Sequence, residues 1–132
     1  MKRQWIKTKS SARKKLILEN DRLFREIIRA RDKVCQKTFK AVNLQVAHYW
    51  TRKILRTRWD LSNACLLNGG AHIHWAHVRP DQFKEFWIRR IGQREFDLLE
   101  IRARYVAPVK MEDLKMINDY LKIKIEEIKC AQ

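Results

Sequence analysis

All four histidines of the chain lie between His48 and His77, and Asn63 lies between the first histidine and the other three. Histidine has an ordinary pKa of about 6.5, so a neutral fraction that can accept a proton from water exists at pH 7. Neutral imidazoles also bind divalent transition metals, which act as Lewis acids toward phosphate. The order His, Asn, His in a strongly basic chain therefore indicates a metal-dependent site that faces phosphate.

Each of these residues suits one part of phosphodiester hydrolysis. We expect His48 to be the general base, and the amide of Asn63 to orient the loop that carries it through local hydrogen bonds. We expect His72 to bind the metal together with a second histidine. Two ligands on a regular α-helix usually lie at i and i+4, whereas His77 is at i+5 from His72 and His74 is at i+2. We favour His77 as the second ligand, and His74 is the alternative.

The charge of the chain favours a polyanionic partner. Thirty Lys and Arg against fifteen Asp and Glu give a formal net charge of +15, which is typical of domains that bind nucleic acid. Seven of the cations, and no acidic residue, occur from Lys33 to Trp59. Arginine binds phosphate through two parallel hydrogen bonds, so we expect the four cations that follow His48 to contact DNA phosphates: Arg52, Lys53, Arg56 and Arg58.

Composition argues against a membrane span and against a cysteine framework. No stretch reaches the roughly 18 apolar residues that a transmembrane helix needs, and the basic N-terminus has no apolar run after it. The three cysteines, Cys35, Cys65 and Cys130, show no C-x-x-C spacing, so we expect neither disulfides nor a zinc-binding quartet. These features predict a cytoplasmic protein, in the host cytoplasm if the chain is viral.

Apolar periodicity predicts a mostly helical α+β protein. Alternation and a short apolar run predict strands over 43–49 and 61–67, and helical spacing predicts helices over 16–34, 71–78, 81–91, 93–105 and 111–128. The run Asn68-Gly69-Gly70 indicates a turn, and Gly92 indicates a break between two helices. The two strands and the helix after them form a ββα core at about 42–79, with C-terminal helices over 81–129.

The length of 132 residues is that of a single domain with one modest core. Seven cations and no acid in residues 1–16 predict a basic arm that is flexible or partly helical. We therefore expect one domain over residues 17–132, preceded by this arm.

These residues and segments resemble the HNH endonucleases with a ββα-metal core, and most closely their phage-type, lambda NinG-like members. The likeness covers roughly residues 20–125 and rests on the order of His48, Asn63 and His72. It rests also on three segments that agree with the family pattern: Asp21-Arg22-Leu23-Phe24, Ala47-His48-Tyr49-Trp50-Thr51-Arg52, and Thr57-Arg58-Trp59-Asp60-Leu61-Ser62-Asn63. The resemblance implies a small ββα-metal core between N-terminal and C-terminal helices.

The chain departs from the family pattern in two ways. The family binds structural zinc with two C-x-x-C pairs, and here only Cys35 is kept, with Thr38, Asn68 and Ala71 at the other three positions. We therefore expect no structural zinc, and other interactions must replace its contribution to folding. The residue before His48, often a further metal ligand in the family, is Ala47.

Residues and resemblance together predict a hydrolase that cleaves phosphodiester bonds in DNA, of HNH type, acting in phage, virus or mobile-element processing or recombination. One divalent ion is implied, Mg²⁺ or Mn²⁺, with Zn²⁺ or Ni²⁺ as alternatives. A homodimer would allow one small site to cut both strands. The alternative is a DNA-binding accessory protein that keeps the HNH scaffold and has lost cleavage, and metal uptake through His72 distinguishes the two.

Overall fold

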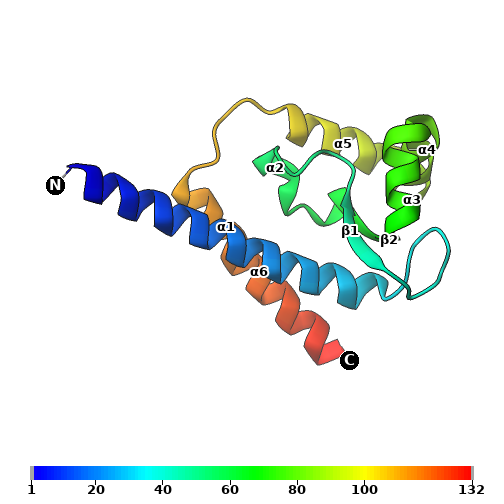
Figure 1. Cartoon of the computed structure of the whole chain (residues 1–132), viewed down its shortest axis with the longest axis horizontal. Helices are drawn as coiled ribbons and strands as arrows, with labels where there is room; N and C mark the ends of the chain where they lie inside the picture. Colours follow the sequence, from blue (N-terminus) through cyan, green and yellow to red (C-terminus); the bar gives the residue numbers. More distant parts are fainter. Residues whose placement is uncertain (1, 132) are drawn as a thin grey trace. The chain divides into compact units, whose positions relative to one another are not determined.

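The computed structural model describes the backbone of residues 2–131, and the side chains of residues 11–131 apart from Ala76. The chain divides into two compact units, one formed by Met1–Ile27 with Pro108–Gln132 and the other by Ile28–Ala107. Both division points fall inside residues 17–132, which we expected to form one domain. Helix α1 (Lys2–Asp32) begins in unit 1 and ends in unit 2 (Figure 1).

Unit 1 contains most of α1 and all of α6 (Met111–Ala131). Asn118 donates a hydrogen bond to Asn20 Oδ1 across 2.9 Å, and Asn20 donates to the carbonyl oxygen of Leu114 across 3.2 Å. Arg13, which precedes Asn20 in α1, donates to the carbonyl oxygen of Val109, which precedes Leu114. Because the contacts advance in the same direction along both segments, α1 and α6 run parallel (Figure 1).

The two helices are also joined by an ion pair between Lys122 and Glu19, at 3.7 Å. Buried apolar side chains recur at helical spacing on each helix, as the sequence predicts: Leu23, Phe24 and Ile27 on α1, and Leu114, Leu121 and Ile125 on α6. A buried amide pair within such a contact fixes the register of two helices at some cost in stability. The predicted helix over 111–128 is confirmed, and the helix predicted over 16–34 begins at Lys2.

The basic segment over residues 1–16 is therefore helical from Lys2 onward. No Gly or Pro interrupts residues 2–32, so nothing in the local sequence ends the helix early. Met1 and the side chains of residues 2–10 lie outside the described part of the chain.

Unit 2 contains an antiparallel hairpin of β1 (Leu44–His48) and β2 (Ala64–Asn68), in which His48 pairs with Ala64. The described residues therefore form an α+β protein that is mostly helical, with one small two-stranded sheet. This confirms the α+β, mostly helical part of the predicted fold class, and the ββα-metal core stays a prediction. The second strand begins three residues later than predicted, because Asp60 accepts a hydrogen bond from the amide of Ser62 and caps a 3₁₀ turn, η1 (Leu61–Asn63).

Helices complete unit 2. One short helix, α2 (Leu55–Arg58), lies in the connection between the strands, where we predicted none. After β2 the chain forms α3 (Gly69–Ile73), η2 (His74–Val78), α4 (Pro80–Ile91) and α5 (Gln93–Arg104). The break at Gly92, where φ is 86°, is as predicted.

The turn predicted at Asn68-Gly69-Gly70 is wrong, because α3 begins there. Asn68 Oδ1 accepts hydrogen bonds from the amides of Gly70 and Ala71, so Asn68 is the N-cap of α3. A Cβ atom at Gly69 would lie 2.8 Å from Nδ2 of Asn43. Gly69 thus leaves room for side chains that lie close to the first residue of α3, and it does not form a turn.

Aromatic side chains form the core of unit 2. Tyr49 is partly buried and packs against this core, with ring centroids 5.1 Å from Phe96, 5.5 Å from Phe83 and 5.6 Å from Trp87. Trp87 is fully buried and donates its indole N–H to the carbonyl oxygen of Ser62 across 2.8 Å. The residue that follows His48 is therefore fixed by three rings from α4 and α5.

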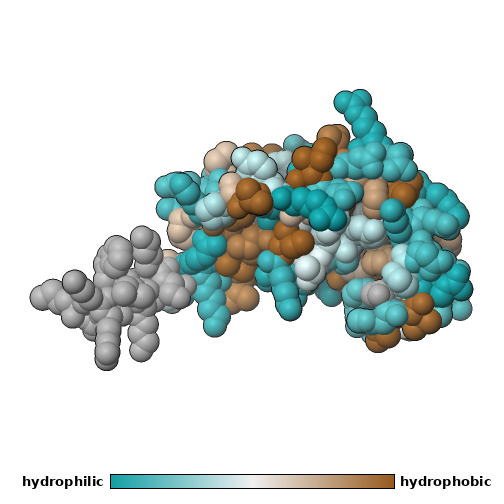
Figure 2. Space-filling view, turned by 90° about the horizontal axis from the view of Figure 1, so that it is seen from above, coloured by the Kyte–Doolittle hydropathy of each residue, from teal (hydrophilic) through white to brown (hydrophobic). Residues whose placement is uncertain are grey.

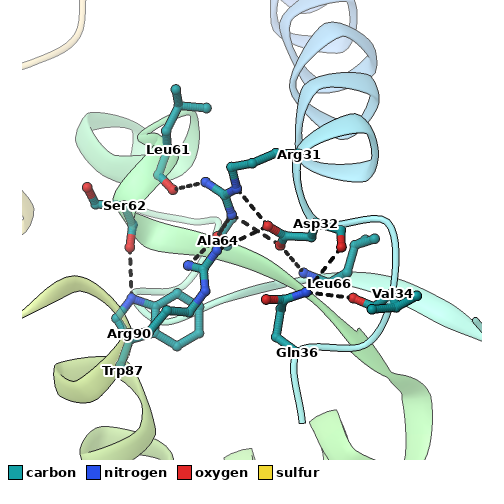
Figure 3. Close-up of polar contacts among 10 residues, drawn as sticks. All are labelled: Arg31, Asp32, Val34, Gln36, Leu61, Ser62, Ala64, Leu66, Trp87 and Arg90. Carbon is teal, nitrogen blue, oxygen red and sulfur yellow. Dashed lines mark hydrogen bonds and ion pairs between the residues drawn. The ribbon is translucent and has the colours of Figure 1, made fainter. Parts of the chain in front are cut away.

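A cluster of Arg31, Asp32 and Arg90 joins the end of α1 to this core (Figure 3). The Asp32 side chain is only 4% exposed, and it pairs with Arg31 at 2.7 Å and with Arg90 at 3.2 Å. It also accepts the amide hydrogen of Leu66 across 2.9 Å, while both arginines donate to the carbonyl oxygen of Ala64. We call this the Asp32 cluster, and it holds β2 against the last turn of α1.

On the face shown in Figure 2, polar side chains cover most of the surface and apolar side chains form scattered patches between them. Among the described residues, no helix combines the length and the apolar character required to cross a membrane.

Candidate functional site

A cavity of about 540 Å³ in unit 2 is lined by three of the four histidines, His48, His72 and His77. His48 is the last residue of β1, His72 lies in α3, and His77 lies in η2. His74 is exposed and is not among the lining residues. The hairpin and the helix after it thus bring together the histidines that we predicted as the base and as the favoured ligand pair.

The local helix geometry explains how His72 and His77 reach the same cavity. Segment η2 is a π-helix, in which the amide of Arg79 donates to the carbonyl oxygen of His74, five residues earlier, across 3.0 Å. In a π-helix the hydrogen bonds close at i+5, so residues five apart take the relation that residues four apart have in an α-helix. His72 lies in α3 and His77 in η2, so the hydrogen-bond pattern changes between them and the i+4 rule of a regular helix does not apply to the pair.

The environment of His72 favours the neutral imidazole. Burial lowers the pKa of His72, and the nearby charge of His77 lowers it further. A metal ligand must be neutral at its nitrogen, and the surroundings of His72 favour that form of its ring. No group of three His, Cys, Asp or Glu side chains within residues 11–131 is arranged to hold a metal ion.

The hydrogen bonding of His48 defines its tautomer. Nε2 of His48 lies 2.9 Å from the carbonyl oxygen of Arg58. A carbonyl oxygen only accepts, so Nε2 carries the proton and donates. In the neutral ring the basic lone pair is then on Nδ1. The candidate base is therefore oriented by the main chain of the α2 segment.

Asn63 is fully buried and holds the connection between the strands. Its Oδ1 accepts from the amide of Trp50 across 2.8 Å, and its Nδ2 donates to the carbonyl oxygens of Trp50 and Thr57 at 3.0 and 2.9 Å. One side chain thus ties the start of the connection, next to His48, to α2. The orienting role of Asn63 in catalysis stays a prediction.

No known protein family, curated protein or solved structure matches this chain. The resemblance to HNH endonucleases therefore depends on the residues and geometry of the chain itself.

The segment that carries Asn63 is attached to α5. Arg102 donates to Asp60 and to Glu95, each across 2.7 Å, and the hydroxyl of Ser62 donates to the same Glu95 oxygen across 3.0 Å. These hydrogen bonds, first that of Arg102 and then that of Ser62, lower the pKa of Glu95. The Asp and Ser of the family-like segment thus have a structural function beside Asn63.

The four predicted phosphate contacts lie in different environments. Arg52 lines the cavity, and Lys53 is exposed next to it in the chain. Arg56 donates from Nε and Nη2 to the carbonyl oxygen of Ala107, at 3.1 Å each, and Arg58 donates to the carbonyl oxygen of Arg52 at 3.3 Å. Arg56 and Arg58 thus support the loop through main-chain oxygens, and contact of the four cations with phosphate stays a prediction.

The four family zinc positions, 35, 38, 68 and 71, lie close together without a cysteine quartet. The buried sulfur of Cys35 accepts from the amide of Thr38 at 3.4 Å and from the amide of Asn68 at 3.2 Å. Burial raises the pKa of this thiol, but the hydrogen bonds from Thr38 and Asn68 outweigh it, so that the net pKa is lowered. Cys65 differs, since burial raises its pKa to about 12.

Sequence reasoning missed the Asp32 cluster and the contacts of Glu95 with Arg102. The sequence held one indication of the Asp32 cluster, because Asp32 is the last acidic residue before the acid-free run from Lys33 to Trp59. An isolated acid beside such a run is a candidate for a buried ion pair. Partners such as Arg90, 58 residues away, have no comparable local signal.

Proposed function

We propose that this chain is a metal-dependent DNA endonuclease of HNH type that hydrolyses phosphodiester bonds. The observation that carries the proposal is that His48, His72 and His77 line one cavity. They do so from a strand, the helix after the second strand, and the π-helix that continues it. The succession β1, β2 and α3 with η2 supports assignment as a ββα core.

In this proposal His48 accepts a proton from water through Nδ1, because Nε2 is engaged with the carbonyl oxygen of Arg58. Asn63 holds the connection that supplies this carbonyl. A divalent ion bound by His72 and His77 would supply Lewis-acid stabilisation of charge on phosphate. Arg52, which lines the cavity, would bind a phosphate oxygen of the scissile strand or of its neighbour.

The test is nicking of supercoiled plasmid with Mg²⁺, Mn²⁺ or Ni²⁺. We expect His48→Ala to lower the rate at least about 100-fold, as is usual for loss of a general base, with DNA affinity nearly unchanged. His74→Ala is the matched control, because His74 is exposed and outside the cavity, and it should cleave like the parent. Equal cleavage by the His48 variant and the parent would reject the proposal.

Metal binding gives an independent test. Calorimetry with Mn²⁺ or Ni²⁺ should detect uptake by the parent and by His74→Ala, and weaker uptake by His72→Ala and His77→Ala. DNA binding without metal uptake or cleavage would instead favour the accessory protein that keeps the scaffold. Assays on plasmid, branched and single-stranded DNA would define the substrate and test a function in phage or mobile-element DNA processing.

A further inference from the structure

The loop between α1 and β1, residues 33–43, carries an exposed aromatic ring on an unfavourable backbone. In Figure 1 it is the cyan loop that follows α1. Three non-glycine residues among those described have positive φ, and all are in this loop: Lys33, Phe39 and Asn43. Lys33 ends α1, where a left-handed residue is common, and Asn tolerates this conformation. Phe39, with φ of 59°, neither ends a helix nor is a residue type that tolerates this conformation.

The fold does not explain a phenylalanine at this position. The Phe39 side chain is 73% exposed and so adds little to the core. Glycine or asparagine would adopt the same backbone at lower cost. Residues in such unfavourable conformations concentrate at functional positions, and an exposed ring in such a position points to a partner outside the chain.

Backbone hydrogen bonds hold the turn that presents Phe39. The amide of Phe39 donates to the carbonyl oxygen of Cys35 across 2.8 Å, and the amide of Cys35 donates to the carbonyl oxygen of Lys40 across 3.0 Å. Cys35 is itself fully buried. The ring is therefore carried by a closed turn fixed to the core, and its conformational entropy is already reduced before any partner binds.

The surroundings of Phe39 match a polyanion. Lys37 and Lys40 flank it, both exposed, and no acidic residue occurs from Lys33 to Trp59. Nζ of Lys37 also lies 4.5 Å from the ring centroid of Trp75, which is in the π-helix that carries His77. The turn is thus attached to the same helix as a candidate metal ligand.

We propose that Phe39 inserts between adjacent base pairs of duplex DNA while Lys40 contacts the phosphate backbone beside it. Proteins that bend DNA use exposed apolar side chains in this way, and flanking cations offset the charge of the phosphates. The inference rests on the proposed DNA-binding function and extends it, since it assigns a contact outside the His48 cavity. A duplex deformed at Phe39 would be positioned relative to η2.

The test measures binding by the full-length His48→Ala protein, without added metal, to a duplex that contains 2-aminopurine. Insertion should unstack a base and raise its fluorescence. In that background Phe39→Asn and Phe39→Gly should lose this rise and bind roughly tenfold more weakly or worse, without a lower Tm. Phe39→Trp should keep both properties. Val42→Ala, at an apolar residue of the same loop that is 63% exposed, is the matched control and should behave like the parent.

Salt dependence separates the two kinds of contact. Phe39→Asn should leave the slope of log K against log salt unchanged, whereas Lys40→Ala should reduce it by about one. The inference would be overturned if Phe39→Asn bound DNA and raised 2-aminopurine fluorescence like the parent. It would also be overturned if the parent itself did not raise this fluorescence. Loss of self-association or of lipid binding, with DNA binding intact, would also overturn it and would assign the ring to another partner.

The outcome is distinguishable from that of the nuclease proposal. If His48-dependent nicking occurs and Phe39→Asn still binds like the parent, insertion is rejected and the nuclease stands. If no nicking occurs but the Phe39 variants lose unstacking, insertion stands on a protein that binds DNA without cutting it.

Discussion

Nε2 of His48 donates a hydrogen bond to the carbonyl oxygen of Arg58 across 2.9 Å. We therefore expect the neutral ring to be the Nε2–H tautomer, with Nδ1 unprotonated. Nitrogen-15 NMR of the imidazole at high pH measures this directly. Arg58→Ala keeps the carbonyl group and should keep the tautomer. A ring protonated at Nδ1 in the parent would contradict the assignment of the basic nitrogen.

Asn63 makes three hydrogen bonds to main-chain groups of Trp50 and Thr57 from a fully buried position. Asn63→Ala should lower the free energy of unfolding by about 3 kcal/mol, at about 1 kcal/mol for each bond. Asn63→Asp keeps the size and one acceptor but turns an oxygen toward two carbonyl oxygens, so it should be no more stable than Asn63→Ala at pH 7. Urea unfolding gives both values, and a loss below about 1 kcal/mol would contradict the role of Asn63.

The Asp32 cluster should contribute more to stability than a similar pair at the surface. Asp32→Ala leaves two arginines and the amide of Leu66 without a carboxylate that is only 4% exposed. We expect a loss of about 2–4 kcal/mol. Asp81→Ala is the matched control, because Asp81 pairs with Arg79 while 66% exposed, and its loss of stability should be much smaller. Similar losses in urea unfolding would contradict this ranking.

Glu95 predicts an acid dependence of stability. Because the hydrogen bonds of Arg102, and then of Ser62, lower the pKa of Glu95 in the folded state, the unfolded chain binds its proton more readily. The contribution is present above the ordinary glutamate pKa and is lost as pH falls through the folded value. The Tm should therefore fall less steeply between pH 7 and pH 3 for Glu95→Gln than for the parent, as thermal unfolding at a series of pH values would measure. Arg102→Gln should produce the same change, and an unaltered slope in both would refute the coupling.

The four positions that correspond to the zinc ligands of the HNH family can be tested by introducing cysteines. The sulfur of Cys35 already accepts from the amides at positions 38 and 68. A Thr38→Cys, Asn68→Cys, Ala71→Cys variant should therefore bind one Zn²⁺ and gain Tm when zinc is added. The same triple variant with Cys35→Ser should bind more weakly. Absence of zinc uptake would count against the resemblance to the HNH family.

The sequence predicted elements well where local pattern determines them. Periodicity predicted α4, α5 and α6, because each has one buried face. Alternation predicted β1, although Ala47, its one buried residue, lies on the face opposite Leu44 and Val46. Asn68-Gly69-Gly70 was misread because a helix cap and a turn use the same residue types. Which one forms is decided by the cap bonds of Asn68 and by the close approach of Asn43.

The site was predictable in residue types but not in geometry. The order of His48, Asn63 and His72 indicated a shared site, yet the register of His77 depends on a π-helix that follows a short α-helix. Nothing in the local propensity of His74–Val78 predicts that hydrogen-bond pattern. The contacts of Arg31 and Arg90 with Asp32 depend on distant segments and were not predictable from sequence spacing.

The discontinuity of unit 1 affects the order in which the chain can fold. Its two helices are joined by an amide pair 98 residues apart in sequence, whereas unit 2 is one continuous stretch from Ile28 to Ala107. During synthesis unit 2 is complete before α6 has been made, so the apolar face of α1 lacks its partner helix at that stage. Closing so long a loop is slow compared with local folding. Newly made chains thus pass through a stage in which Leu23, Phe24 and Ile27 are open to chaperones or to aggregation.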